Sequence, residues 1–133
     1  MRPVPALILT LCLAAACSGD ATAPEDRNDH VIRVTGQVTD LDGTPLPRAF
    51  VELYRTECLN CTFNEGESID NIYGSSTCDD EGRFAIAATV DCRTGGAGPK
   101  IRARAGGFLT RVQFTACTAA EQTFEFALPK EAP

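Results

Sequence analysis

The sequence has few of the residue types that catalytic and sugar-binding sites commonly use. Its 133 residues include no tryptophan, two tyrosines and one histidine. His30, the one histidine, lies in a polar segment near the N-terminus, so a Ser–His–acid or Cys–His nucleophilic system inside the fold is not expected. The tyrosines, Tyr54 and Tyr73, supply little of the aromatic surface on which sugar rings are bound.

Basic side chains are also in the minority. The chain has 12 Lys and Arg against 18 Asp and Glu, a formal net charge of −6. A net-acidic chain is a poor ligand for polyanions, which argues against nucleic acid and against adsorption to an anionic membrane. A Gly-rich loop that cradles phosphate is missing too, because Gly95-Gly96-Ala97-Gly98 has no predicted helix after it.

The chain has no hydrophobic run long enough to span a bilayer. Its apolar stretch, Val4–Ala16, is about thirteen residues, whereas a spanning helix needs roughly 20. Residues 1–16 are therefore predicted to be a signal peptide. The junction Ala14-Ala15-Ala16-Cys17 resembles a bacterial lipobox, which implies cleavage before Cys17 and lipid attachment, such as palmitate, to it. Ordinary signal-peptidase cleavage after Ala16 is the alternative, and a later cut would place Pro24 in a disfavoured position.

The next segment, residues 17–30, is polar and acidic and has no apolar period. Such a composition indicates a flexible tether between the lipidated Cys17 and a folded body. Ser18 in the second position resembles the signal for outer-membrane sorting. We therefore expect an exported protein that is held to the bacterial cell envelope by its N-terminal lipid, with the outer membrane favoured and the leaflet left open.

From Val31 onward the dominant signal is strict alternation of apolar and polar side chains. This period of two is typical of strands with one buried face, and no segment has a sustained helical period. We predict an all-β fold, a single β-sandwich of six to seven strands over residues 31–129, followed by a tail at 130–133. The predicted strands centre on Ile32–Val38, Ala49–Leu53, Phe84–Ala88, Ile101–Ala105, Phe108–Phe114 and Phe124–Leu128.

Short turn motifs separate most of these segments. Asp40-Leu41-Asp42-Gly43 and Asp79-Asp80-Glu81-Gly82 combine local acceptors with a glycine that tolerates positive φ. Gly106-Gly107 is a two-residue hairpin signal. One connection differs, because residues 56–80 have little periodicity. A loop of that length is commonly functional or cross-linked.

The segment 34–53, Val-x-Gly-x-Val-Thr-Asp-x-x-Gly-x-Pro-Leu-x-x-Ala-x-Val-x-Leu, resembles the carboxypeptidase regulatory-like domain, a transthyretin-like β-sandwich. Asp80-x-Gly82-x-Phe84 and the run from Ile101 to Phe108 resemble the same family's second turn and its Ala-x-Gly-aromatic hairpin. The resemblance implies a module that is generally noncatalytic, so we expect no enzyme activity and no cofactor. It implies nothing for the cysteine-bearing connection, where the chain departs from the family.

Five cysteines fall inside the predicted domain: Cys58, Cys61, Cys78, Cys92 and Cys117. An exported chain favours disulfides. Cys92 with Cys117 is the preferred pair, since each follows the end of a predicted strand. Cys78 is expected to pair with Cys58 or Cys61 and to staple the long connection. Because five is odd, one thiol stays free, pairs between molecules, or reflects a different pairing.

The motif Cys58-Leu59-Asn60-Cys61 also fits a redox pair or a zinc ligand pair. A redox thiol needs a helix N-terminus or a cationic neighbour, and Glu57 acts in the opposite sense. A structural zinc site needs a second close pair of ligands, which Cys78 and Cys92 are too widely spaced to form. The acids of the two turns are better explained by turn formation than by calcium, so we expect no metal.

The remaining candidates for binding are basic and aromatic. Arg102, Arg104 and Arg111 point outward on two predicted neighbouring strands, so they could form an anion-binding patch. They could equally form cross-strand pairs with residues such as Glu125. Tyr73 is the best candidate for an exposed aromatic. We expect a structural or protein-interaction module with an envelope partner. The alternative is a carbohydrate- or peptide-binding module that uses the connection at 56–80.

Overall fold

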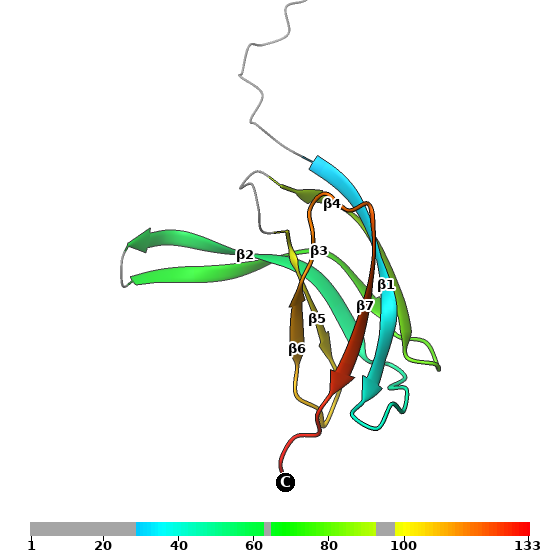
Figure 1. Cartoon of the computed structure of the whole chain (residues 1–133). Helices are drawn as coiled ribbons and strands as arrows, with labels where there is room; N and C mark the ends of the chain where they lie inside the picture. Colours follow the sequence, from blue (N-terminus) through cyan, green and yellow to red (C-terminus); the bar gives the residue numbers. More distant parts are fainter. Residues whose placement is uncertain (1–28, 63–64, 93–97) are drawn as a thin grey trace, which may run out of the picture.

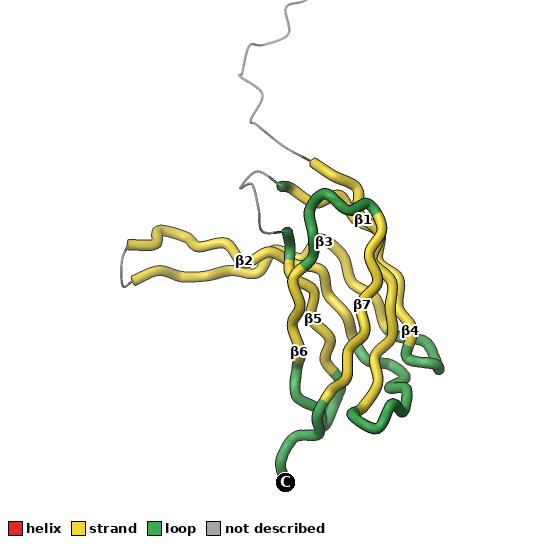
Figure 2. The backbone as a smooth tube through the Cα atoms, in the orientation of Figure 1, coloured by secondary structure: helices red, strands yellow, loops and turns green. Residues whose placement is uncertain are grey.

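The computed structural model describes residues 29–62, 65–92 and 98–133. They form an all-β fold of two sheets packed face to face (Figures 1 and 2). The three-stranded sheet has the order β4-β1-β7 and the four-stranded sheet the order β3-β2-β5-β6. The predicted β-sandwich of six to seven strands is confirmed. The strands are β1 (Asp29–Asp40), β2 (Phe50–Thr62), β3 (Glu65–Thr77), β4 (Arg83–Asp91), β5 (Lys100–Arg104), β6 (Arg111–Phe114) and β7 (Glu121–Leu128).

The core lies between the sheets and is made by the alternating apolar residues of both. Ile32, Leu53 and Phe126 are almost fully buried, as period-two alternation predicts for the inward face of a strand. β1 is the central strand of its sheet, antiparallel to β4 and parallel to β7. The parallel pairing places the first and last strands side by side in one sheet.

Two turns with the same hydrogen-bond pattern close one end of the sandwich. Oδ1 of Asp40 accepts bonds from the backbone N–H groups of Asp42 and Thr44, each at 2.9 Å. Oδ1 of Asp79 accepts equivalent bonds from Glu81 and Arg83, also at 2.9 Å. The glycine of each turn has positive φ, 84° at Gly43 and 71° at Gly82. The acids therefore act as acceptors within their own turns.

The connection at 56–80 is a pair of strands, and its interpretation as an irregular loop was wrong. β2 continues to Thr62 and β3 returns from Glu65. Beyond Tyr54, which is the last β2 residue paired with β5, β2 pairs with β3 alone. The result is a two-stranded extension, called here the ribbon, that projects from the sandwich (Figure 1). In the part of the chain that the structure describes, no layer covers either face of the ribbon. Without a buried face, its sequence shows no apolar alternation.

The predicted strand Phe108–Phe114 begins later, and its faces are reversed. Six residues, 105–110, separate β5 from β6, so the two-residue hairpin at Gly106-Gly107 was also wrong. Val112 is 46% exposed and Phe114 70% exposed, although we expected both in the core. Gln113 lies opposite the buried Ile101 and therefore faces inward. The C-terminal segment, expected as a tail, pairs back through Phe108 and Lys130.

A disulfide joins Cys92, just after β4, to Cys117, just after β6, with the Cα atoms 6.0 Å apart. This is the pair that the sequence favoured. Cys78 is a buried free thiol, while Cys58 is disulfide-bonded. The predicted bond of Cys78 to Cys58 or Cys61 is therefore wrong, because Cys78 follows β3 at the base of the sandwich and Cys58 lies far along the ribbon. The side chain of Cys61, the leader 1–16 and the lipidation site Cys17 lie outside the described residues.

Candidate functional site: the outer face of the four-stranded sheet

The face of the four-stranded sheet that points away from the core carries a cluster of aromatic and basic side chains. Residues directly opposite each other in an antiparallel pair share a face. Glu52 is opposite Arg102, and Arg102 is opposite Val112, so the members can be assigned from the register. We call this cluster the outer platform. Its residues are Phe50, Glu52, Tyr54, Ile72, Lys100, Arg102, Arg104, Val112 and Phe114.

Glu52 is the centre of the outer platform. It is only 7% exposed although no other layer of the described residues covers this face. Its two carboxylate oxygens accept bonds from Nε of Arg102 at 2.5 Å and from Nη2 of Arg104 at 3.0 Å. A carboxylate removed from water needs such charged partners. The cost of burying Glu52 is therefore offset by two arginines from the neighbouring strand.

Arg102 links the sheet to the ribbon. Its Nη1 donates to Oδ2 of Asp70 at 2.9 Å, while Oγ1 of Thr56 donates to Oδ1 of the same carboxylate at 2.9 Å. The hydrogen bonds from Thr56 and then Arg102 hold the pKa of Asp70 below its ordinary value of 3.8. The hydrogen bond to Glu52 raises the pKa of Arg102 above its ordinary value. Both groups are therefore charged throughout the physiological range.

Each cation of β5 also lies against an aromatic ring. The guanidinium carbon of Arg102 is 4.2 Å from the ring centroid of Tyr54. That of Arg104 is 5.1 Å from Phe50, and Nζ of Lys100 is 6.0 Å from Phe114. These distances fall within the range of cation–π attraction. The platform is thus a row of three cation–aromatic pairs, and Glu52 joins the two that contain Arg102 and Arg104.

The edges of the platform are apolar and open to solvent. Phe114 is 70% exposed, and Val112 and Ile72 are each 46% exposed. Phe114 and Val112 belong to the edge strand β6, whereas Ile72 lies opposite Tyr54 at the base of the ribbon. Exposed large apolar side chains beside a polar centre are typical of interaction surfaces.

The structure brings only part of the predicted basic patch together. Arg102 and Arg104 share the platform, but Arg111 is opposite the fully buried Ala103 and so belongs to the other face of the sheet. The acid partner is Glu52 and not Glu125. The sequence analysis did not single out Glu52, and only the strand register shows that it meets the two arginines.

Tyr73 is not an exposed aromatic. The pairing shifts between Leu53–Gly74 and Tyr54–Ile72, so Tyr73 is the extra residue of a bulge in β3. It is partly buried and packs against the core. A bulge changes the direction of the side chain it carries, and this is why Tyr73 cannot serve as a platform for a sugar ring.

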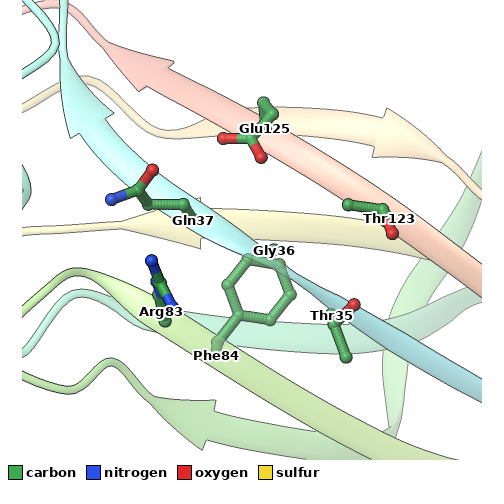
Figure 3. Close-up of a pocket in the computed structure, with 7 residues that line it drawn as sticks. All are labelled: Thr35, Gly36, Gln37, Arg83, Phe84, Thr123 and Glu125. Atoms are coloured by element: carbon green, nitrogen blue, oxygen red, sulfur yellow. The ribbon is translucent and has the colours of Figure 1, made fainter.

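Apart from the outer platform, a hollow lies on the three-stranded sheet (Figure 3). It measures about 330 Å³ and is lined by Thr35, Gly36, Gln37, Arg83, Phe84, Thr123 and Glu125. Gly36 has no room for a side chain, because a Cβ there would collide with the carbonyl oxygen of Phe124 and come within 2.8 Å of the Phe84 ring. The hollow is open to solvent and most of its lining side chains are polar. Arg83 is already paired with Glu81 at 3.4 Å.

Within the described residues, no group of three or more His, Cys, Asp or Glu is placed to hold a metal ion. Nor does that part of the chain include a helix long and apolar enough to cross a membrane. The Cys-x-x-Cys motif that begins at Cys58 also fits a redox or zinc site by sequence. In this structure Cys58 is disulfide-bonded. Its sulfur is therefore not available as a thiolate ligand in this form.

No protein-family model and no curated protein matches the chain. Solved structures with a similar fold include 3-chlorocatechol 1,2-dioxygenase from Rhodococcus opacus 1CP, with a TM-score of 0.50 and 14% identity over 80% of this chain. Another is catechol 1,2-dioxygenase from Acinetobacter sp. ADP1, with a TM-score of 0.48 and 16% identity over 82% of this chain. The chain spans 62% and 55% of those two proteins.

This comparison corrects the expectation that the chain is not an enzyme. That expectation came from a family whose sandwiches are generally noncatalytic, whereas 3-chlorocatechol 1,2-dioxygenase, which has a similar fold, is an enzyme. The fold therefore gives no ground for excluding catalysis. At 14% identity the likeness shows a shared fold alone, and no activity is assigned to this chain from it.

Proposed function

We propose that this chain is an exported, lipid-anchored β-sandwich of the bacterial cell envelope that binds a partner protein through the outer platform. The relationship to the carboxypeptidase regulatory-like domain is part of the same proposal. Its support is that Gly43 and Gly82, which stand at the matched turn positions, both have the positive φ that only glycine adopts easily. The signal peptide at 1–16 and the lipid on Cys17 rest on the sequence motif.

The observation that carries the binding proposal is that the arginine side chains of the platform are held in fixed positions before any partner binds. Interfaces are enriched in Tyr, Phe and Arg, and their strongest contacts come from such side chains in desolvated positions. Arg102 and Arg104 are already held by Glu52 and by the rings beneath them. A partner would therefore lose little side-chain entropy on binding to them. The exposed Phe114 and Val112 add apolar area to be buried.

The ribbon enlarges this surface. Ile72 at its base and Asp70 two residues before it share the platform face. The ribbon itself projects away from the sandwich (Figure 2). Because Asp70 is bonded to Arg102, the base of the ribbon is tied to the sheet. A partner protein can thus contact the sheet and the ribbon together.

The test is site-specific photo-cross-linking in cells that express the full chain with its leader. A photoreactive phenylalanine analogue replaces Phe114, and the matched control replaces Val31, which is 69% exposed on the other sheet. We expect one protein to be cross-linked at position 114 and not at 31. That protein, once purified, should bind the wild type and bind the Phe114→Ala variant more weakly. Equal cross-linking at both positions, or equal binding of both proteins, would contradict the proposal.

The anchor has its own test. Intact mass of the protein from the membrane fraction should show a chain that begins at Cys17 and carries a lipid increment. An unmodified chain that begins at Cys17, or one that keeps residues 1–16, would contradict this part of the proposal and leave the platform unaffected.

A further inference from the structure

The backbone of β6 presents hydrogen-bonding groups to solvent at two residues of the platform. The N–H of Thr115 donates to the carbonyl of Pro99 at 2.9 Å, which makes that pair a hydrogen-bonded one. In an antiparallel ladder, bonded and non-bonded pairs alternate. The N–H and C=O groups of Val112 and Phe114, opposite Arg102 and Lys100, therefore point away from β5 toward the open edge.

Within the described part of the chain, nothing pairs with this edge. β6 is the last strand of its sheet. Gln113 extends from it to the carbonyl of Glu125 at 2.8 Å, so this side chain caps the adjacent edge of β7. The C-terminal segment pairs through Lys130 with Phe108 and does not reach β6. Open backbone groups and exposed side chains therefore coincide at Val112 and Phe114.

The two strands nearest this edge carry charge of one sign. β5 and β6 together carry Lys100, Arg102, Arg104 and Arg111 and no acid, in a chain of net charge −6. Arg102 and Arg104 are engaged by Glu52. Among the described residues no acid pairs with Lys100 or Arg111. Lys100 lies over Phe114 at one end of the strand, and Arg111 begins the strand at the other end.

We infer that the β6 edge binds an extended acidic–apolar segment of the partner protein by strand addition. Main-chain bonds to Val112 and Phe114 would supply affinity, and alternate side chains would supply selectivity. Two apolar side chains, two residues apart, would pack on Val112 and Phe114. An acid on each side of them would meet Lys100 and Arg111. This inference rests on the proposed function and names the chemistry of its partner.

The test begins with selection of nine-residue peptides from a random library on the full-length protein, with the Val112→Pro variant as the matched control. Proline removes one open N–H, and Val112→Thr, which keeps it, shows whether the fold of the edge persists. We expect enrichment of peptides with alternating apolar residues and at least two acids. Such a peptide should bind Val112→Pro at least about tenfold more weakly than Val112→Thr.

Two further measurements identify the mode of binding. In an added strand, alternate peptide amides point toward β6 and the others point away from it. N-methylation of the amides that face β6 should abolish binding, whereas N-methylation of the intervening amides should leave binding intact. The Lys100→Glu variant should weaken binding, and a peptide with lysine in place of the acids should recover part of it. Selection of basic peptides would overturn the inference. So would equal effects of N-methylation at the two sets of amides, or an affinity that does not change in Val112→Pro.

The failures of the two proposals can be distinguished. If position 114 cross-links a partner whose affinity is unchanged in Val112→Pro, the platform binds by side chains and strand addition is wrong. If the amides of Val112 and Phe114 become protected from hydrogen exchange as the protein alone is concentrated, a second copy occupies the edge and the peptide assignment is wrong.

Discussion

The guanidinium of Arg102 stacks on the ring of Tyr54 at 4.2 Å while its Nε donates to the carboxylate of Glu52. A planar guanidinium can stack with its face and donate with its edge at the same time, whereas an ammonium can do only one of these well. The arrangement explains how Glu52 is buried on a sheet face that none of the other described strands covers.

This geometry predicts that Arg102→Lys is not a conservative change. The variant keeps the charge but loses the stacking and one of the two acid contacts, so the free energy of unfolding should fall by about 1–2 kcal/mol. Urea denaturation of the full chain measures it. The control is Arg83→Lys, at a side chain that is 67% exposed, where the change should stay within about 0.5 kcal/mol. Equal effects at both positions would argue against a structural role for the stack.

The hydrogen bond from Thr56 is the largest cause of the lowered pKa of Asp70. Thr56→Val removes it and keeps the shape of the side chain, so the pKa of Asp70 should rise toward 3.8. Because the folded pKa lies below the unfolded value, this group stabilises the fold above the unfolded pKa. That contribution is lost as pH falls through the folded pKa. Carbon-13 NMR titration of the Asp70 carboxyl measures the shift, and an unchanged pKa would refute the assignment.

Burial, followed by the charge of Asp79, raises the pKa of the Cys78 thiol to about 11. The unfolded thiol ionises near pH 9, so stability is fully present below that pH and declines as pH rises from 9 toward 11. Cys78→Ala should lack this part of the alkaline decline. The check is urea denaturation of wild type and variant across this pH window. Parallel curves would contradict the prediction.

Gly36 and Gly106 form a matched pair for a steric test. A Cβ at Gly36 would collide with the Phe124 carbonyl, whereas nothing lies within 4 Å of one at Gly106. Gly36→Ala should lower the free energy of unfolding by about 3 kcal/mol, and Gly106→Ala should change it by less than about 1 kcal/mol. Urea denaturation of both variants measures the difference, and a tolerated Gly36→Ala would show that β1 and β7 can separate locally.

The sequence predicted the sandwich because most strands have one buried face. Ile32, Leu53 and Phe126 follow from alternation alone. The same rule misplaced Val112 and Phe114, because on a short edge strand an exposed apolar face alternates just as a buried one does. It also missed the ribbon, whose strands have no buried face to mark them.

The site was harder to predict than the fold for a physical reason. Glu52 and Arg102 are 50 residues apart, and they meet only because Leu53 is in register with Ile101. Register depends on how whole strands pair, which local sequence does not determine. Arg111 was assigned to the wrong face for the same reason, since one position along β6 reverses the direction of a side chain.

The most direct test of the outer platform as a binding surface compares the affinity of the cross-linked partner for two truncation variants. Phe114→Ala removes an exposed ring from the platform, and Val31→Ala removes an exposed side chain from the opposite sheet. The account predicts a loss of about tenfold or more in affinity for Phe114→Ala and no change for Val31→Ala. Equal affinities, or a loss confined to Val31→Ala, would contradict it.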